Sequence, residues 1–442
     1  MSKLVCFWVS YVMDINFPND IMKITIYSEG EKYMKILNFG SCNIDYVYGV
    51  DAIVRPGETI PVKELKQFPG GKGLNQTIAI ARAGSEVWHA GCIGEDGLFL
   101  KRLMEENGVH TEYLCVGNER TGQAIIQVEP TGENCILVYG GANVCNTKEY
   151  MDEVLSKFEE GDFLVLQNEI NNLNYLIDRA YERKMKIVLN PSPCNEAMKS
   201  IDLSKITYLV LNEIEATFFS DIADPYDSVI QLKKKYPELS VVLTIGKKGC
   251  FYTREGMVLH HPAFKAKAVD TTAAGDTFTG YLVSGLCKGK DFSECIRLAN
   301  AAAGIGIQSE GAAPSIPTIE TVLQKIETME VQAYESMEWK KKLVDNYLFH
   351  NMKEASLEEL AKLMNYSPSY MSRWIAANMG DSFSEILQKK RCELAAEYLR
   401  STEMPIQEII ECVGYNNEGF FRSIFQKMYG VLPLEYRKGK NK

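Results

Sequence analysis

Two short segments of this sequence carry residue types suited to phosphoryl chemistry. The first, GGKGLNQ at residues 70–76, combines glycines, which let a backbone approach a ligand closely, with a lysine and an asparagine that can reach polar atoms. It fits neither the P-loop pattern nor the dinucleotide-binding fingerprint. Taken alone, the segment is more typical of an ordinary glycine-rich entry to a helix.

The second segment, VDTTAAGDTFTG at residues 269–280, places small residues just before an expected helix. Backbone N–H groups there are free to hold an anion at the positive end of the helix. Asp276 could accept the proton of a hydroxyl whose oxygen attacks phosphorus. The same pattern is also typical of a helix start with an aspartate N-cap.

Both segments must be positioned by the elements around them. From Met34 to about Ile326, short apolar runs at 163–166, 186–189, 208–211 and 241–244 alternate with helix-length stretches such as 174–183 and 225–236, and residues 34–40 form the expected first strand. This alternation predicts βα units and a mostly parallel sheet with helices on both faces. Stretches at 62–67 and 121–138, the latter containing the turn 131–134, predict a small separate sheet.

The strands stop after Ile326, and the remainder of the chain reads as helices. Ser356 and Ser367 are placed as N-caps, while Gly380, Gly414 and Gly430 punctuate helix ends. We therefore expect four segments in the 442 residues: an N-terminal extension that is either disordered or an incorrectly assigned start (1–33), an α/β domain (34–328), a linker (329–340) and a helical domain (341–442).

Composition excludes several classes of protein. No apolar run approaches the ~20 residues needed to span a bilayer, so an integral membrane protein is not expected. The twelve cysteines include no CxxC pair, which argues against a zinc site or a disulfide framework and suits a reducing cytoplasm. The net charge is −10, yet the segment from Lys341 has 15 basic against 13 acidic residues, so only that segment suits a polyanion.

The two glycine-rich segments, in this order and at this separation, resemble the two signatures of the ribokinase (PfkB carbohydrate kinase) family, and the resemblance extends from Met34 to Ile326. It implies an α/β ribokinase-like three-layer fold with a small β-sheet lid, and phosphorylation of a sugar by ATP with Mg²⁺ and K⁺ as cofactors. Asp276 would be the catalytic base. The implied anion hole is formed by Ala273, Ala274 and Gly275, with the Asp276 amide.

The resemblance also implies the remaining site residues. The sugar contacts are Asn43, Asp45, Gly71, Lys72, Asn75, Glu169 and Asp276. The nucleotide contacts are Asn212, Thr244, Gly246, Lys247, Gly249, Gly275 and Asn300. Glu215 would order the water shell of Mg²⁺. A monovalent cation would bind among oxygen donors of Asp270, Thr272, Gly306, Ser309, Gly311 and Ser315.

Further expectations concern the substrate and the oligomer. In the family the lid closes over the sugar and makes the dimer contact, so a homodimer is implied. The strings around 70–76, 133–143 and 190–193 favour D-ribose, converted to ribose 5-phosphate. Cys42 and Leu74 occupy variable positions among the sugar contacts, which leaves deoxyribose, another pentose or a nucleoside open.

The helical segment from about Lys341 resembles the AraC/XylS-type DNA-binding domain, which has two helix-turn-helix units joined by a long helix. We expect Leu360, Ile409, Phe421 and Phe425 in its core. The residues expected to contact double-stranded DNA are Ser369, Tyr370, Arg373, Arg391, Asn417, Glu418 and Arg422. Because the segment's net charge is only +2, binding should be weak and salt-sensitive unless a dimer supplies a second site.

Three hypotheses for the whole chain follow. The first is an active sugar kinase joined to a DNA-binding domain that regulates sugar-utilisation genes. The second is a sugar-sensing transcription factor whose kinase fold is only a receptor, and the third is an enzyme with a vestigial helical tail. A receptor has no need of a base, so Lys72, Asn75 and Asp276 favour the first hypothesis over the second.

Overall fold

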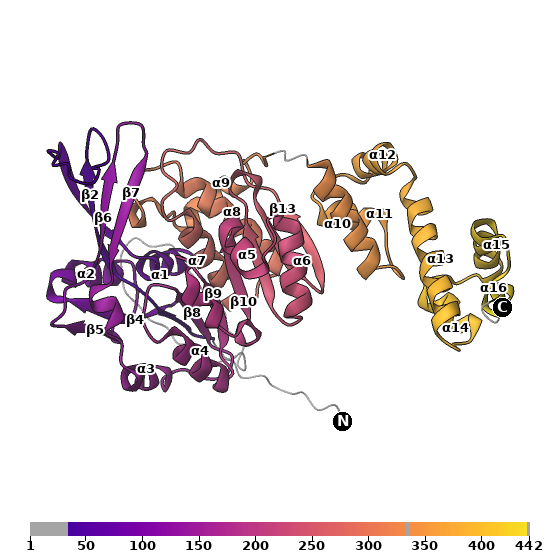
Figure 1. The fold of residues 1–442 in the computed structure, drawn as a ribbon, viewed down its shortest axis with the longest axis horizontal. Coiled ribbons are helices and arrows are strands. Elements are labelled where there is room, and N and C mark those ends of the chain that lie inside the picture. Colours follow the sequence, from indigo (N-terminus) through magenta and orange to yellow (C-terminus); the bar gives the residue numbers. More distant parts are fainter. Residues whose placement is uncertain (1–33, 333–335, 440–442) are drawn as a thin grey trace, which may run out of the picture. The chain divides into compact units, whose positions relative to one another are not determined.

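The computed structural model describes residues 34–332 and 336–439 (Figure 1). The predicted extension over residues 1–33 and residues 333–335 of the predicted linker lie outside the described residues. No helix in the described ranges is long and apolar enough to cross a bilayer.

The main sheet has nine strands in the order β13-β12-β11-β10-β9-β8-β1-β4-β5. The strands from β5 to β11 run parallel, and β12 and β13 form an antiparallel hairpin at one edge. Their bounds are β1 Ile36–Phe39, β4 Trp88–Gly94, β5 Leu114–Gly117, β8 Phe163–Gln167, β9 Lys186–Asn190, β10 Tyr208–Asn212, β11 Ser240–Thr244, β12 Cys250–Arg254 and β13 Met257–His261. The predicted parallel strands are confirmed.

Alternate side chains of these strands enter two separate cores, as the period of two in a strand requires. Val165 and Val188 pack on the side of α1, α7 and α8, whereas Leu166 and Leu189 pack on the side of α3 to α6. Helices therefore cover both faces of the sheet (Figure 1), which is the predicted three-layer arrangement. The helix bounds are α1 Lys72–Arg82, α2 Leu98–Glu106, α3 Lys148–Leu155, α4 Leu173–Glu182, α5 Glu213–Ser220, α6 Pro225–Lys235, α7 Ala274–Cys287, α8 Phe292–Gly306 and α9 Ile319–Ile326.

The small sheet has four strands in the order β3-β2-β6-β7. They are β2 Asn43–Gly49, β3 Glu64–Gly70, β6 Gly122–Val128 and β7 Asn134–Tyr139. The predicted strand at 62–67 runs instead to Gly70, because its pairing with β2 continues until Gly70 faces Asn43. One end of this lid sheet is thereby joined to the first glycine-rich segment.

The C-terminal region is entirely helical within the described residues. Its helices are α10 Met337–His350, α11 Leu357–Leu363, α12 Pro368–Met379, α13 Phe383–Ser401, α14 Ile406–Cys412, α15 Glu418–Tyr429 and α16 Pro433–Lys438. Ser356 and Ser367 accept hydrogen bonds from the third residue of α11 and α12, as the sequence predicted. The four expected core residues are buried as well.

Helix α10 packs against the α/β part of the chain as well as against the helices that follow it. Asn346 accepts a hydrogen bond from the backbone N–H of Val258 on edge strand β13 at 2.9 Å. Lys342 forms an ion pair with Asp227 on α6 at 2.8 Å. This helix begins at Met337, within the stretch that the sequence suggested was a linker, because its first turn is capped by Ser336 and holds the buried Trp339.

Candidate active site

The glycines of the first segment allow the chain to run between two elements without side chains in the way. Strand β3 ends at Gly70 and α1 begins at Lys72, with Gly71 at a positive φ of 94°. A Cβ added at Gly73 would lie 2.3 Å from the Ser41 nitrogen, and one at Gly70 would lie 2.1 Å from Oδ2 of Asp45. Because glycine has no Cβ, the backbone at residue 73 can lie against Ser41, and the backbone at residue 70 can lie against the Asp45 carboxylate.

Asn43 and Asp45 lie on β2, where they pair in register with Gly70 and Phe68. Oδ1 of Asn43 accepts a hydrogen bond from Asn143 at 2.7 Å. Oδ1 of Asp45 is buried and has no hydrogen-bond partner among the described residues. Burial, together with the charge of Glu169, raises the pKa of Asp45 to about 7. Such an acceptor suits the hydroxyl of a polyol.

Glu169 lies close to Asp45, and with Lys72 and Asn43 these residues are called the cradle. The Glu169 carboxylate accepts hydrogen bonds from the Ser41 hydroxyl and from the Lys72 backbone N–H, the latter at 3.0 Å. Burial lowers the pKa of the Lys72 ammonium, but the carboxylates of Asp276, Glu169 and Glu215 outweigh burial, so the pKa is raised. Lys72 therefore stays charged in a half-buried position close to three carboxylates.

The second segment forms the N-terminus of α7. Ala273 adopts a left-handed conformation with φ 59° and offers no side-chain cap. The amide of Ala274 bonds to the Thr271 carbonyl at 3.2 Å, so it is already occupied. Among the described residues, no partner is found for the amides of Gly275 and Asp276, and a Cβ added at Gly275 would meet nothing within 4 Å. An anion could bind at these two amides.

The two segments meet at Asp276. Its Oδ2 accepts a hydrogen bond from Asn75 at 3.1 Å, and its Oδ1 accepts one from Gln76 at 2.9 Å, across about 200 residues of sequence. Oδ1 of Asn75 is buried and unpartnered within the described part of the chain. The Asp276 carboxylate is thus oriented by the side-chain amides of Asn75 and Gln76. It lies beside the Asn75 Oδ1, which accepts no hydrogen bond from the described residues.

The predicted nucleotide residues lie at the ends of β10 and β11 and on α8. Asn212 and Glu215 form a capping box at the start of α5, with Asn212 Oδ1 accepting from the Glu215 amide at 3.0 Å. Gly246 and Gly249 have positive φ, and a Cβ at Gly249 would lie 2.0 Å from the His261 carbonyl. Asn300 is buried and directs its amide N–H to Ile296 and His261.

The predicted monovalent-cation residues gather in one place. Oδ1 of Asp270 accepts from both the amide and the hydroxyl of Thr272, and its Oδ2 accepts from the Gly311 amide at 2.9 Å. Ser309 bonds to Gly306, whose added Cβ would lie 3.5 Å from the Ser315 carbonyl oxygen. The atoms of these residues that could bind a cation are all oxygens, which fits a hard, weakly held ion.

The model of the pfkB family carbohydrate kinase matches residues 34–319. The chain belongs to the pfkB family of carbohydrate kinases. The kinase is similar to a ribokinase from Haemophilus influenzae, with 35% identity over 65% of this chain and 97% of the relative.

Solved structures agree with this assignment. A ribokinase from Cryptococcus neoformans in complex with ADP matches with a TM-score of 0.60 and 31% identity, covering 66% of this chain and 99% of the other. A ribokinase from Arabidopsis thaliana complexed with ribose and ATP matches with a TM-score of 0.59 and 28% identity, covering 67% of this chain and 99% of the other. The kinase thus has the ribokinase-like fold that the sequence predicted.

The C-terminal part of the kinase chain matches a helix-turn-helix domain model over residues 360–439, which confirms the predicted AraC-type DNA-binding domain. Ser369 and Arg373 are exposed on α12, and Asn417, Glu418 and Arg422 are exposed at the start of α15. Glu418 and Arg422 pair with each other, and Asn417 caps α15.

Two of the predicted DNA contacts have other partners in the structure. Tyr370 is half-buried, and its hydroxyl accepts a hydrogen bond from Lys340 at 3.1 Å. Arg391 donates to the backbone carbonyls of Met352 and Lys353, at 2.9 and 2.8 Å, and stacks over Tyr415. Each side chain joins parts of the helical domain because hydrogen bonds within the protein take up its polar group.

Sequence reasoning missed three polar residues that hold the kinase site together. Ser41 bonds to Glu169, Asn143 bonds to Asn43, and Gln76 bonds to Asp276. Gln76 lies inside the first signature, so its position next to Asn75 was a usable signal. Asn143 had a weaker one in the string GGAN at 140–143, which does not indicate the long-range pairing of β2 with β6.

Proposed function

We propose that this carbohydrate kinase transfers the γ-phosphoryl group of ATP to the primary hydroxyl of D-ribose, giving ribose 5-phosphate and ADP. The observation that carries the proposal is the position of Asp276, which is buried at the start of α7 and held through both carboxylate oxygens by the first signature. A base must lie beside both the hydroxyl and the phosphate that it attacks. Asp276 adjoins the free amides of the second signature.

The proposed reaction uses these groups in a simple order. Asp45 and Asn75 accept hydrogen bonds from sugar hydroxyls through oxygens that have no described protein partner. Asp276 takes the proton of the reacting hydroxyl while its oxygen forms a bond to the γ-phosphorus. The bond from phosphorus to the β-phosphate oxygen breaks, and ADP leaves. The amides of Gly275 and Asp276 face the negative charge that spreads over the phosphoryl oxygens.

The cofactors of the proposed reaction would be held by the remaining polar residues. Mg²⁺ would neutralise phosphate charge, and Glu215 would order its waters. K⁺ would fit among the oxygens of the Asp270 to Ser315 cluster. Each Asp270 oxygen already accepts a hydrogen bond, so the carboxylate is held in place and supplies charge close to the turn before α7.

D-ribose is favoured as the substrate because the ribokinases from Haemophilus influenzae, Cryptococcus neoformans and Arabidopsis thaliana match this chain over nearly their whole length. Cys42 and Leu74 are both fully buried next to the cradle, so they shape the pocket and could admit deoxyribose. A nucleoside would need more space than a free pentose.

The test is an ATP-coupled assay over pentoses, hexoses and nucleosides, with and without K⁺, on the wild type and on Asp276→Asn. We expect the highest kcat/KM with D-ribose and a loss of at least about 100-fold in kcat for the variant. Equal turnover by both proteins would remove Asp276 from its role. Absence of turnover with every substrate would favour a sugar receptor.

We further propose that the helical domain binds double-stranded DNA and regulates sugar-utilisation genes. Arg373 on α12 and Arg422 on α15 are exposed, and we expect their guanidinium groups to reach base edges. A salt-titrated gel shift with the region upstream of the protein's own gene tests this. Arg373→Ala should weaken binding by about 10-fold, and unchanged binding by a folded variant would contradict the assignment.

The lid sheet is the proposed contact of a homodimer. All six residues of β7 are exposed, and they include Ile136, Leu137, Val138 and Tyr139. Apolar side chains on an edge strand are normally covered by a partner. A second copy of the same sheet would supply one.

A further inference from the structure

A row of buried amide side chains stands behind the proposed base. Gln76 donates to Asp276 at 2.9 Å, and its Oε1 accepts from Gln167 at 2.7 Å. The Gln167 amide also donates to Oδ1 of Asn38 at 3.0 Å. Asn38, Gln76 and Gln167 are essentially inaccessible to solvent. Buried polar groups of this kind are oriented by their hydrogen bonds.

One backbone carbonyl sets the direction of the whole row. Nδ2 of Asn38 donates to the Gly73 carbonyl at 2.9 Å, and a carbonyl can only accept. Oδ1 of Asn38 must therefore face Gln167, whose amide nitrogen then faces Oε1 of Gln76. The amide nitrogen of Gln76 is left to donate to Asp276.

Asn190 favours the same orientation of the Gln76 amide through a separate hydrogen bond. Its Nδ2 donates to the Val210 carbonyl at 2.9 Å, so its Oδ1 is an acceptor for Gln76, at 3.2 Å. If the Gln76 amide were turned over, its oxygen would face two acceptors, Asn190 Oδ1 and the Asp276 carboxylate. Both neighbours therefore hold the donor toward the base.

We propose that Gln76 is a positioning residue for the kinase reaction. It holds one oxygen of Asp276 in place and stabilises the ionised carboxylate, while Asn75 holds the other oxygen. The inference rests on the proposed role of Asp276 as base. Gln76 itself does not have to touch sugar or nucleotide.

The test compares Gln76→Met and Gln76→Glu with the wild type. A carboxylate that loses a donor, or gains a neighbouring negative charge, binds its proton more tightly. We expect kcat to fall about 10- to 100-fold with KM values within about 3-fold, since a small misplacement of a reacting group is costly. The acid limb of the kcat profile should move to higher pH, further in Gln76→Glu than in Gln76→Met.

Two controls keep the result interpretable. Ser284→Ala changes a buried hydroxyl on α7 that bonds to Ala83, away from the site, and should leave kcat unchanged. Gln167→Met removes the donor that orients Gln76 and should reproduce part of the Gln76→Met effect if both variants keep their unfolding temperature. An active wild type, an inactive Asp276→Asn and a Gln76→Met with normal kcat and acid limb would overturn this inference alone. Inactive wild type would overturn the proposed function with it.

Helix α10 contacts both residues near the proposed nucleotide-binding loop, residues 244–249, and the first recognition helix, α12. His260 on β13 has its pKa lowered to about 4 by burial and donates through Nε2 to the Lys248 carbonyl in that loop at 2.9 Å. The Lys248 ammonium lies 5.4 Å from the centre of the Trp339 ring. Trp339 packs edge-on against Phe251 and donates to Asp224 at 3.0 Å.

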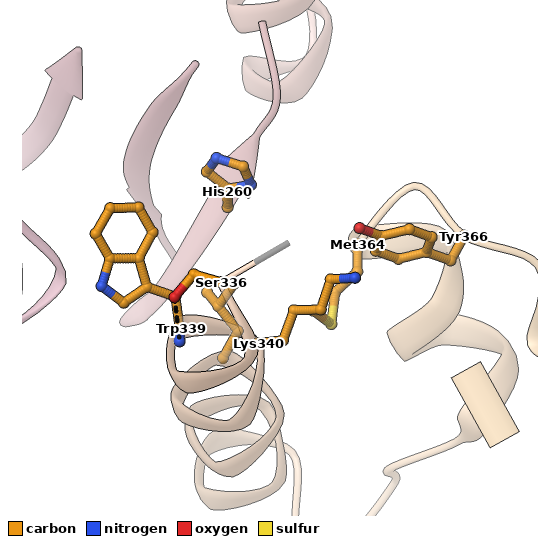
Figure 2. A pocket seen from close by; sticks show the side chains of 7 residues that line it. His260, Ser336, Trp339, Lys340, Met364 and Tyr366 are labelled. Carbon is orange, nitrogen blue, oxygen red and sulfur yellow. Dashed lines mark hydrogen bonds between the residues drawn. The ribbon is translucent and has the colours of Figure 1, made fainter. Parts of the chain in front are cut away.

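The next residue of α10 faces the other way (Figure 2). Lys340 is only 5% exposed, and its ammonium lies 4.6, 5.3 and 5.5 Å from the ring centres of Tyr366, Tyr370 and Trp374. Tyr370 and Trp374 belong to α12, the first recognition helix. The cavity between these groups measures about 20 Å³, room for at most about one water, so it is a packing gap.

We infer that nucleotide binding at residues 244–249 and DNA binding through α12 are coupled by α10. A nucleotide phosphate that attracts the Lys248 ammonium would draw it away from the Trp339 ring. Since Trp339 and Lys340 are consecutive residues of α10, this change would reach the aromatic contacts of Lys340. Coupling of this kind is reciprocal for binding free energies. DNA should therefore change ADP affinity by the same factor as ADP changes DNA affinity.

The experiment measures both affinities on the full chain, with ADP and a duplex from the region upstream of the protein's own gene. We expect a change of about 5-fold or more, equal in both directions. Trp339→Phe together with Lys248→Met should reduce it to less than about 2-fold, whereas exposed Lys341→Met should preserve it. Equal affinities with and without the second ligand would overturn the inference, as would coupling that survives in the double variant.

Hydrogen exchange at residues 366–374, with and without ADP, gives a readout that does not depend on DNA. Changed protection is expected in the wild type and in Lys341→Met but not in the double variant. Unchanged protection in the wild type, with ADP shown to bind, would also overturn the coupling. A protein that binds no ADP would instead contradict the proposed kinase function.

Discussion

Asp45 shows at the scale of one residue how the site is built at the expense of stability. Its carboxyl has a pKa near 7 because it is buried beside Glu169 with one oxygen unpartnered. The folded chain then binds its proton more tightly than the unfolded chain does. Folding stability should therefore fall as pH rises from about 4 to about 7, the window between the two pKa values.

The corresponding variant is Asp45→Asn. We expect it to be more stable than the wild type at pH 8, by no more than about 4 kcal/mol, with a smaller difference at pH 5. Sugar affinity should fall, because an amide replaces an acceptor that matches a hydroxyl. Unfolding temperatures at both pH values and calorimetric titration with D-ribose measure these effects. Asp51→Asn, on an exposed ion pair, is the control; a variant destabilised at pH 8 would contradict the argument.

The same residue scale shows what the sequence can and cannot predict about the site. Asn75 and Asp276 are recognisable because each lies in a short glycine-rich string, and the structure places them 3.1 Å apart. Gln76 and Asn143 act through contacts with residues 200 and 100 positions away, respectively. Such contacts depend on the packing of α1, α7 and the lid, which no local pattern encodes.

At the scale of elements, local chemistry predicted most of the fold. The β-branched runs became β8 to β11, and the serine caps became the starts of α11 and α12. The hairpin β12-β13 and the docking of α10 on β13 were not predicted. Both features depend on tertiary contacts at the edge of the sheet. One such contact is the hydrogen bond between Asn346 on α10 and Val258 on β13.

The lid sheet makes a testable prediction at this scale. Leu137 is 59% exposed on edge strand β7, and a dimer would bury it. Leu137→Lys should shift the protein from dimer to monomer and raise the KM for sugar, because the lid then lacks its support. Light scattering after size exclusion measures the mass. Leu323→Lys, a comparably exposed leucine on α9, should remain dimeric; a monomeric wild type would rule out the lid dimer.

The charges of the whole molecule set limits on how it can bind DNA. The chain up to residue 340 has a net charge of −12, and the helical domain only +2, so phosphate attraction is small. Arg391 is held by backbone carbonyls and contributes little to it. We therefore expect specific binding to require both recognition helices.

The two recognition helices are joined by α13, which has 19 residues and so spans about 28 Å. Successive major grooves on one face of B-DNA recur at about 34 Å. A continuous helix cannot stretch or twist to follow a changed spacing between two DNA sites. Helix α13 begins with a capping box and packs against α14, α15 and α16, which fix its position relative to the second unit. The two units should thus read two sites one turn apart on a single DNA face.

An insertion between the two half-sites tests this geometry. Adding 5 base pairs places the second half-site on the opposite face, and adding 10 places it a full turn too far, so both should reduce affinity to that of one unit. We expect a loss of at least about 100-fold in either case, since each unit then binds without the other. A connection that unwinds and extends could reach the site displaced by 10 base pairs, which stays on the same face of the DNA, better than the site displaced by 5. Gel shifts with the three duplexes therefore distinguish a rigid α13 from an unwound one.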